Sequence, residues 1–312
     1  EAILNETYKN IHGVLIIKNG KLVFEEYFHG YDCEKPHQIR SATKSIGSVL
    51  TGIAIDNGFI LNVDEKIYPY FRSYEPESKW NERSKNVKLK HLLTMTSGYE
   101  CDDHKSNFKC EKEMYKSNDW VEFALTLPMV SQPGEHWAYN SASLWLVGEM
   151  ISKTSSMKIP DFAKRYLFDP LGITDFQWGF SPNGRAWLAG NAEMRPRDMA
   201  KFGYMVLNNG RWQDRQIVSK KWLEESTAEH VPLHDMRIHG GRYGYGYLWW
   251  LVKLTVKNQS AEAIAASGNG GQIIAIFPKL DLVTVFTGGN YNSSLSAQPV
   301  EMLIRYILPA MM

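Results

Sequence analysis

The residues with the clearest chemical potential are a serine and a lysine three positions apart, in the tetrad Ser41-Ala42-Thr43-Lys44. On a helix this spacing places a hydroxyl and an amine about one turn apart. A serine hydroxyl becomes a good nucleophile only when a neighbouring base takes its proton. An ordinary lysine is protonated at neutral pH, so a lysine base must be desolvated or lie beside another cation or a hydrogen-bond donor. The pair therefore predicts nucleophilic acyl transfer through Ser41, with Lys44 as the base.

The same Ser-x-x-Lys pattern occurs twice more, at 106–109 and at 155–158, and only the surroundings distinguish the three. The pattern at 106–109 lies in a charged segment flanked by cysteines, and the one at 155–158 follows a predicted helix that has already ended. After Ser41, apolar residues recur at helical spacing: Ile46, Val49, Leu50 and Ile53. The pattern ends at Asn57-Gly58, where a glycine can terminate a helix. This run predicts an amphipathic helix with one buried face, so only Ser41 is expected to stand on a rigid element.

A Ser-Lys pair needs a third group to complete the proton transfers, and Tyr139 is the candidate. A phenol can pass a proton between the amine, the serine and the leaving group. Tyr139 lies in the segment 133–141, where a Pro-Gly turn leads to a helix that is expected to begin near Ser141. A tyrosine at such a junction can point into a cleft. The alternative is an interfacial tyrosine whose ring is buried and whose hydroxyl meets water.

A glycine-rich segment, Ser267 to Gln272, precedes a predicted strand at Ile273 to Phe277. Glycine lets the backbone approach a ligand closely, and backbone N–H groups can donate to an oxyanion. The same composition is typical of an ordinary hairpin turn, so both interpretations stay open.

The overall composition argues against several classes of partner. The chain has 312 residues, of which 44% are hydrophobic and 22% charged, as in an ordinary soluble globular protein. A formal net charge of +1 does not favour nucleic acid or an anionic membrane. No apolar run approaches the roughly 20 residues of a membrane-spanning helix. No zinc-binding motif occurs, so we expect no metal and no cofactor.

The three cysteines leave two possibilities. Cys101 and Cys110 bracket a polar loop at a spacing that a disulfide can close, which would leave Cys33 as a free thiol. The alternative is three unlinked thiols. A bond would indicate an oxidising compartment, so a periplasmic or secreted location is favoured over a cytoplasmic one.

Strand patterns at both ends of the chain enclose a helical middle. Asn19-Gly20 between two apolar runs predicts a hairpin, and further strands are expected at 247–254, 272–277 and 282–287. We therefore expect an α/β (α+β) fold, in which one antiparallel sheet from both chain ends is flanked by helices and carries an inserted helical lobe. The chain is expected to form a single domain, residues 1–312. Its α/β lobe would comprise about 1–60 and 240–312, and its helical lobe about 61–239.

Taken in order, these segments resemble the penicillin-recognising serine hydrolase superfamily of the class C β-lactamase type. Within it the chain is most similar to the branch of esterases and 6-aminohexanoate-dimer (nylon-oligomer) hydrolases. The resemblance extends through most of the chain and includes the segments Asn62 to Asp64, His91 to Gly98, Phe168 to Ile173 and Arg195 to Ala200.

This resemblance implies a β-lactamase/transpeptidase-like fold and a role for each candidate residue. Ser41 would be the acylated nucleophile, Lys44 its base and Tyr139 the tyrosine of the second family motif. Asn269-Gly270-Gly271 stands where relatives have Lys-Thr-Gly or His-x-Gly. The oxyanion hole would then be formed by the backbone N–H groups of Ser41 and Gln272.

Two departures from the family pattern bear on the substrate. Ser141 stands where β-lactamases usually have asparagine, and Asn269 stands where they have lysine. A neutral amide cannot replace the charge-assisted contact of a lysine with a substrate carboxylate. Both changes lower the expectation of penicillin or peptidoglycan turnover.

The expected function is therefore cleavage of a small ester or linear amide through an acyl-enzyme on Ser41, with a Ser-Lys-Tyr catalytic set. The expected partner is this small-molecule substrate. One alternative is a β-lactamase or D-amino-acid peptidase. The other is a peptide- or cell-wall-binding protein on the same scaffold that has lost turnover.

Overall fold

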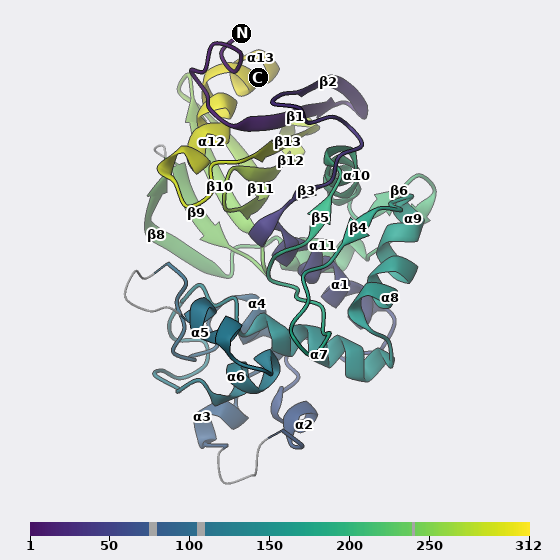
Figure 1. Cartoon of the computed structure of the whole chain (residues 1–312), viewed down its shortest axis with the longest axis vertical. Helices are drawn as coiled ribbons and strands as arrows, with labels where there is room; N and C mark the ends of the chain where they lie inside the picture. Colours follow the sequence, from purple (N-terminus) through teal and green to yellow (C-terminus); the bar gives the residue numbers. More distant parts are fainter. Residues whose placement is uncertain (75–79, 105–109, 239–240) are drawn as a thin grey trace.

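The computed structural model describes residues 1–74, 80–104, 110–238 and 241–312 (Figure 1). Its main element is an eight-stranded antiparallel sheet with the strand order β2-β1-β13-β12-β11-β10-β9-β8. The strands are β1 (Ile11–Lys18), β2 (Lys21–Tyr27), β8 (Val231–Ile238), β9 (Gly241–Tyr245), β10 (Trp250–Val256), β11 (Gln259–Gly268), β12 (Gln272–Phe277) and β13 (Leu282–Gly288). Since β1 pairs with β13, the two ends of the chain build one sheet, as predicted.

Helices and short strands joined by loops make up the rest of the described chain. The helices are α1 (Thr43–Asp56), α2 (Tyr68–Phe71), α3 (Glu82–Lys85), α4 (Leu89–Leu93), α5 (Cys110–Lys116), α6 (Trp120–Thr126), α7 (Leu144–Ser155), α8 (Ile159–Ala163), α9 (Asp169–Leu171), α10 (Pro196–Leu207), α11 (Lys220–Ser226), α12 (Gln298–Met302) and α13 (Leu308–Met311). The short strands are β3 (His37–Gln38), β4 (Phe176–Gln177), β5 (Glu193–Met194), β6 (Arg211–Trp212) and β7 (Arg215–Gln216). In Figure 1 the helices α2 to α7 lie at the end of the molecule away from β1 and β2. The division into lobes at 1–60, 61–239 and 240–312 stays a prediction.

Local sequence explains where the strands of the sheet begin and turn. Asn19 and Gly20 have φ of 50° and 73°, the left-handed conformation that a tight hairpin turn requires, so the predicted β1–β2 hairpin is confirmed. The strand predicted at 247–254 begins later, at Trp250. Tyr247 N–H donates to Ser226 O and Leu248 N–H to Leu93 O, and Leu248 has a φ of 63°. These bonds take both residues out of the sheet ladder.

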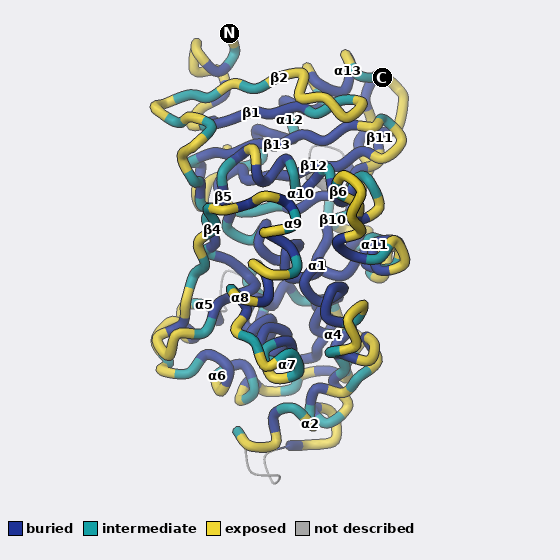
Figure 2. The backbone as a smooth tube through the Cα atoms, turned by 90° about the vertical axis from the view of Figure 1, so that its right-hand side faces the viewer, coloured by how far each residue is buried: buried dark blue, intermediate teal, exposed yellow. Residues whose placement is uncertain are grey.

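Successive side chains of the central strands point to opposite faces of the sheet, so the strands contribute to two separate apolar cores. Ile274 and Ile276 of β12 belong to the larger core, which includes α1, α10 and the helical middle. Ile273 and Phe277 face the other way, into a smaller core under the C-terminal helical run from α12 to α13. Figure 2 shows the central strands as largely buried backbone. The sheet is therefore covered on both faces, and α1 lies inside the protein.

The helix α1 is buried more completely than its sequence predicts. Every residue from Thr43 to Ala54 is buried, so the prediction of a single buried face is wrong. Small side chains make this possible, because a Cβ on Gly52 would lie 2.2 Å from the Trp222 ring. The Ser45 hydroxyl donates to Leu248 O at 2.8 Å, which satisfies one of the buried polar groups. A helix enclosed on all sides holds the residues at its start in fixed positions.

A pair of histidines connects β1 to β3. The His12 Nδ1 and His37 Nε2 atoms lie 2.8 Å apart, and the His12 ring stacks on Tyr31 with centroids 4.1 Å apart. Burial lowers the pKa of His12 from 6.5 to about 4, and the nearby His37, His29 and Lys35 act in the same direction. Burial also lowers the pKa of His37. Both imidazoles are therefore neutral in the folded protein at neutral pH.

We expect the free energy of unfolding to fall as the pH drops from about 6.5 towards 4, because the unfolded chain then binds protons that the folded protein does not. In His12→Gln this fall is expected to be shallower, since the variant has one such histidine fewer. Urea denaturation across this pH range measures the difference. His136→Gln, which changes an exposed histidine, is the matched control and should keep the wild-type slope. A wild-type slope in His12→Gln would contradict the prediction.

Candidate active site

Ser41 and Lys44 lie where a short 3-10 turn, Arg40–Ala42, leads into α1. Lys44 Nζ lies 3.0 Å from Ser41 Oγ, within direct hydrogen-bonding distance. The lysine is only 2% exposed, its Nζ donates to Ala189 O at 2.7 Å, and it lies 4.8 Å from the centre of the Tyr139 ring. The geometry thus allows a proton to pass directly between the two side chains.

The backbone around Ser41 is unusually constrained. Arg40 has a φ of 51°, a left-handed conformation that costs free energy for any residue other than glycine. The end of β11 lies against the same turn, because a Cβ on Gly268 would lie 2.3 Å from Ile39 O and 3.1 Å from Ser41 N. Only glycine allows such an approach. The start of α1 and the end of β11 therefore form one compact unit around the serine.

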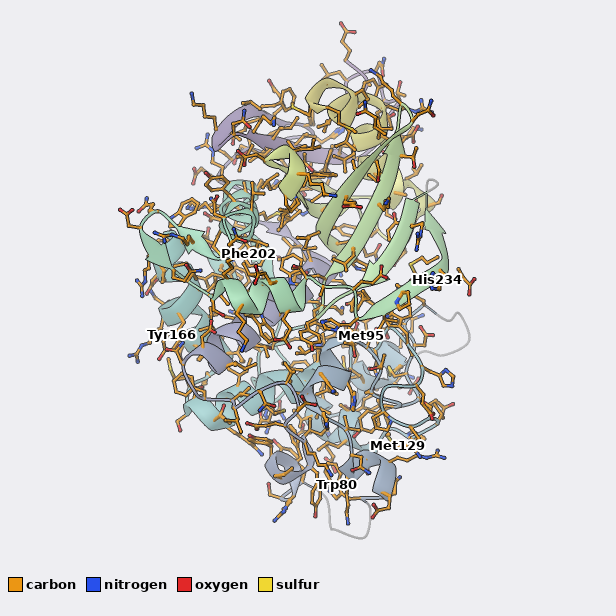
Figure 3. All side chains as sticks on the ribbon, turned by 180° about the vertical axis from the view of Figure 1, so that it is seen from behind. Trp80, Met95, Met129, Tyr166, Phe202 and His234 are labelled. Carbon is orange, nitrogen blue, oxygen red and sulfur yellow. A yellow bond between two sulfur atoms is a disulfide. The ribbon has the colours of Figure 1, made fainter. Side chains whose placement is uncertain are left out.

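Tyr139 is placed beside Lys44 by contacts on both sides of its own peptide. Ala138 N–H donates to Met95 O at 2.9 Å, and Asn140 N–H donates to Met95 Sδ at 3.4 Å. Met95, labelled in Figure 3, itself has a left-handed φ of 59°. Tyr139 is 6% exposed and meets Lys44 with the face of its ring. Within the described part of the chain its hydroxyl has no hydrogen-bond partner, so the ring and not the hydroxyl contacts the lysine.

A disulfide loop holds the other side of the Tyr139 segment. Cys101 and Cys110 are bonded, with their Cα atoms 5.5 Å apart, and Cys33 is free. Asp103 N–H donates to Tyr139 O at 2.8 Å, and Asp103 Oδ2 accepts the N–H of Ser141 at 2.9 Å. The loop thereby fixes the Tyr139 segment at two points. The repeated Ser-x-x-Lys pattern at 106–109 lies outside the described residues.

His104, in the same loop, stacks on the Tyr139 ring with centroids 4.5 Å apart and planes 12° apart. It also lies beside Trp250, at 6.3 Å between centroids. Neither Asp103 nor His104 was a predicted site residue. Both residues lie more than 30 sequence positions before the Tyr139 segment that they contact, as in the Asp103–Ser141 bond. No local spacing in the sequence could therefore reveal these contacts.

The glycine-rich segment serves both as a hairpin turn and as a wall of the site. Gly270 and Gly271 have φ of 95° and 94° in the turn between β11 and β12. Gly268 and Asn269 line the same cavity as Ser41, Tyr139 and Ser141. Gly271 and Gln272 are not among the residues that line this cavity.

Gln272 and Asn269 are both occupied by structural hydrogen bonds. Gln272 is fully buried, and its side-chain amide donates to Gly288 O at 2.5 Å and accepts Gly288 N–H at 3.2 Å. Asn269 Nδ2 donates to Asn292 Oδ1 at 2.7 Å, and Asn292 N–H donates back to Asn269 Oδ1 at 2.8 Å. The backbone N–H of Gln272 as an oxyanion donor stays a prediction. Gln272 does not line the cavity, and the strand residue that lies against Ser41 is Gly268. The next backbone N–H along the chain after Gly268 is that of Asn269.

A cavity of about 800 Å³ opens at Ser41, which is within the range of small-molecule sites. Its polar wall near the serine includes Arg40, Tyr139, Ser141 and Asn269. Among the described residues no group of three or more histidine, cysteine or acidic side chains could hold a metal ion. No helix in the described ranges is long and apolar enough to cross a membrane.

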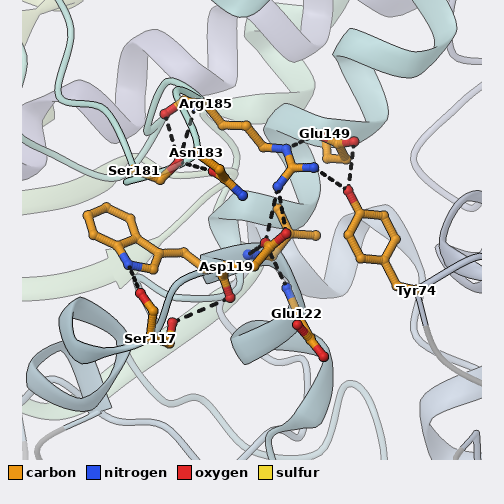
Figure 4. A network of polar contacts seen from close by, with 10 residues as sticks. Tyr74, Ser117, Asp119, Glu122, Glu149, Ser181, Asn183 and Arg185 are labelled. Carbon is orange, nitrogen blue, oxygen red and sulfur yellow. Dashed lines mark hydrogen bonds and ion pairs between the residues drawn. The ribbon is translucent and has the colours of Figure 1, made fainter.

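An ion-pair network fixes the segment that supplies the Ala189 carbonyl to Lys44 (Figure 4). Arg185 donates to both carboxylate oxygens of Asp119, at 3.1 and 2.9 Å, and to the Tyr74 hydroxyl at 2.8 Å. Arg185 Nε also lies 3.3 Å from a Glu149 oxygen. Asp119 in turn accepts the first free N–H groups of α6. The Arg185 guanidinium thus links the start of α6, the helix α7 and the segment after α2 to the segment that contacts Lys44.

We expect Arg185→Met to lower the free energy of unfolding by about 1–3 kcal/mol, because two neighbouring carboxylates lose their shared cation. Although burial alone would raise the pKa of Asp119, its bonds with Arg185 and with the N–H groups of α6 lower it. Urea denaturation at neutral pH measures the loss. The control is Lys164→Met, which removes an exposed ion pair with Asp169 and should change stability by less than about 1 kcal/mol. Equal losses in the two variants would contradict the prediction.

Comparison with known proteins identifies a family and several relatives. The family model described as Beta-lactamase matches residues 7–302. The 6-aminohexanoate-dimer hydrolase of Paenarthrobacter ureafaciens is 22% identical over 288 residues, which cover 87% of this chain and 70% of that enzyme. Simvastatin synthase from Aspergillus terreus is similar in structure, with a TM-score of 0.77, 15% identity, and coverage of 99% of this chain and 95% of that one.

A shorter match is to the lovastatin esterase of Penicillium rubens, which is 29% identical over 130 residues. The matched part covers 40% of this chain and 32% of the esterase. The chain thus spans about a third of the length of that relative. The similarity to simvastatin synthase, at 15% identity, establishes the fold alone.

Proposed function

The chain belongs to the beta-lactamase family, and from this premise we propose that it is a serine hydrolase that cleaves small esters or linear amides through an acyl-enzyme on Ser41. The observation that carries the proposal is the contact of 3.0 Å between Lys44 Nζ and Ser41 Oγ at the mouth of the cavity. A buried amine at this distance from a serine hydroxyl is the arrangement that nucleophilic acyl transfer requires.

We assign one residue of this chain to each step of the proposed reaction. Lys44 Nζ takes the proton of Ser41 Oγ, and the oxygen attacks the substrate carbonyl carbon. The oxyanion then accepts hydrogen bonds from the N–H groups of Ser41 and Asn269, the latter in place of Gln272. We assign the return of the proton to the leaving alcohol or amine to the Tyr139 hydroxyl, which has no hydrogen-bond partner among the described residues, while the Tyr139 ring lies against Lys44. Water then attacks the acyl-enzyme and releases the acid.

Two features favour esters and linear amides over β-lactams. The Asn269 side chain is neutral and is held by Asn292, so it offers no cation to a substrate carboxylate. Ser141 presents a short hydroxyl where β-lactamases usually have an amide. The names of the relatives, an esterase and a 6-aminohexanoate-dimer hydrolase, support the same choice.

A substrate panel tests this proposal. We expect p-nitrophenyl acetate and butyrate to be hydrolysed fastest, a linear p-nitroanilide more slowly, and nitrocefin slowest. A nitrocefin rate that rivals the ester rates would favour a β-lactamase instead. A fluorophosphonate probe should label the wild-type protein on Ser41. If no covalent adduct forms and no substrate turns over, the chain is a binding protein.

A further inference from the structure

The cavity at Ser41 continues along one face of the sheet, beyond the catalytic groups. On β11 the side chains of Ser267, Ala265 and Ala263 point to the same face, since alternate residues of a strand share a face. All three line the cavity, and so does Ser41. From Ser267 to Ala263 the strand extends by four residues, or about 13 Å. The cavity therefore reaches well past the site of bond cleavage.

Apolar side chains surround this extension. Its walls are Val252 and Leu254 of β10 with Ile273, Ala275 and Phe277 of β12, and its roof is Val300 and Leu303 of the C-terminal helical run. The charged residues that line the cavity lie elsewhere, on the turn before Ser41 and on the disulfide loop and α5. We call the part between β10–β12 and this roof the alanine arm, after its floor of Ala263, Ala265 and Ala275.

The alanine arm exists because side-chain size changes across the sheet. Further along the same face, β13 presents Leu282 and Phe286, and β1 presents Val14 and Ile16, which fill the space under the C-terminal helices. On β11 and at the middle of β12 the corresponding positions are the alanines Ala263, Ala265 and Ala275. Since protein interiors are normally packed without voids, a cavity of about 800 Å³ whose lining includes both Ser41 and these alanines indicates a binding site.

We propose that the alanine arm binds the flexible apolar chain of an ester substrate. The inference rests on the proposed function at Ser41 and adds the class of substrate. A chain with no polar atoms matches a lining with no charges, and each buried methylene should raise kcat/KM by about fourfold until the arm is full. The chain can belong to the acyl group or to the alcohol, and the experiment separates the two.

The test uses two series of esters with the full protein. One series varies the acyl chain, from p-nitrophenyl acetate to p-nitrophenyl octanoate. The other varies the alcohol, from ethyl acetate to octyl acetate. We expect kcat/KM to rise steeply with chain length in one series and to stay nearly flat in the other. Flat profiles in both series would overturn the inference while leaving the proposed function intact.

Variants of the arm sharpen the result. Ala265→Leu should lower kcat/KM for the longest ester of the favoured series by tenfold or more, and that for the shortest by less than about twofold. Leu303→Ala, which enlarges the roof, should move the optimum to a longer chain and guards against a folding defect in the first variant. Ala228→Leu, at an exposed alanine, is the matched control. Equal losses for short and long esters in a folded Ala265→Leu protein would overturn the inference.

A binding measurement separates this inference from the proposed function. Methyl octanoate, octyl acetate and methyl acetate are titrated by calorimetry into Ser41→Ala, which cannot turn them over. Tighter binding of either long ester, lost when Ala265→Leu is added, supports the alanine arm even if no ester is hydrolysed by the wild type. Equal binding of all three esters would overturn it. Absence of hydrolysis by the wild type, by contrast, would overturn only the proposed function.

Discussion

Replacing Ser41 by alanine is expected to abolish hydrolysis of every ester and amide, with kcat falling by about 10⁶-fold or to the rate of the uncatalysed reaction. The reason is that the side-chain oxygen is the atom that bonds to the substrate, and among the described residues Ser41 carries the only hydroxyl within hydrogen-bonding distance of Lys44 Nζ. The fold should be unchanged, since Ser41 contributes little packing and lies at the surface of the cavity. Initial rates with p-nitrophenyl butyrate and thermal unfolding measure the two quantities.

The chain supplies its own control for this experiment. Ser155 stands in the same Ser-x-x-Lys spacing, but its hydroxyl donates to Ile151 O at 2.6 Å at the end of α7. Ser155→Ala should therefore keep full activity and full labelling by a fluorophosphonate. Residual turnover in Ser41→Ala at more than about one thousandth of the wild-type rate would remove Ser41 from the nucleophile's role.

Replacing Lys44 by methionine is expected to lower kcat by about 10⁴-fold, because the serine loses the only base within hydrogen-bonding distance in the described structure. Methionine keeps most of the length and apolar volume of the side chain, so the buried site is not emptied. The loss should fall on kcat and on the rate of fluorophosphonate labelling, while KM changes little. Stopped-flow kinetics with p-nitrophenyl butyrate can follow acylation directly.

Lys44→Arg distinguishes a base from a merely positive neighbour. Arginine keeps a charge but cannot give up its proton near neutral pH, so this variant should be as slow as Lys44→Met. Lys158→Met, in the repeated motif and on an exposed lysine, is the matched control and should be fully active. Activity in Lys44→Arg close to that of the wild type would show that the charge, not proton transfer, is what matters.

The sequence was sufficient to predict the general fold and the principal pair of the site. Asn19-Gly20 indicates the first hairpin, and the strand patterns at 272–277 and 282–287 indicate the centre of the sheet, because these are local signals. The Ser41–Lys44 contact is also favoured by local geometry, since two residues three positions apart on a helical turn lie on the same side.

What could not be predicted depends on contacts between distant parts of the chain. Met95 accepts a hydrogen bond from the Tyr139 segment, and the Ala189 carbonyl accepts one from Lys44. Arg185, just before Ala189 in the chain, is bound by Asp119. None of these pairs has a characteristic spacing in the sequence. The sequence predicts contact with the serine at Gln272, whereas the strand residue that lies against Ser41 is Gly268. A run of several glycines does not reveal which of them touches a neighbouring helix.

The pairing of β1 with β13 has a consequence for how this protein is made. Ile16 finds its partner Thr284 only after most of the chain has been synthesised. Until then the nascent hairpin β1–β2 carries an apolar strand with one edge unsatisfied, the kind of surface that associates with other chains. The long-range closure of this sheet should also make folding slow compared with that of a helical protein.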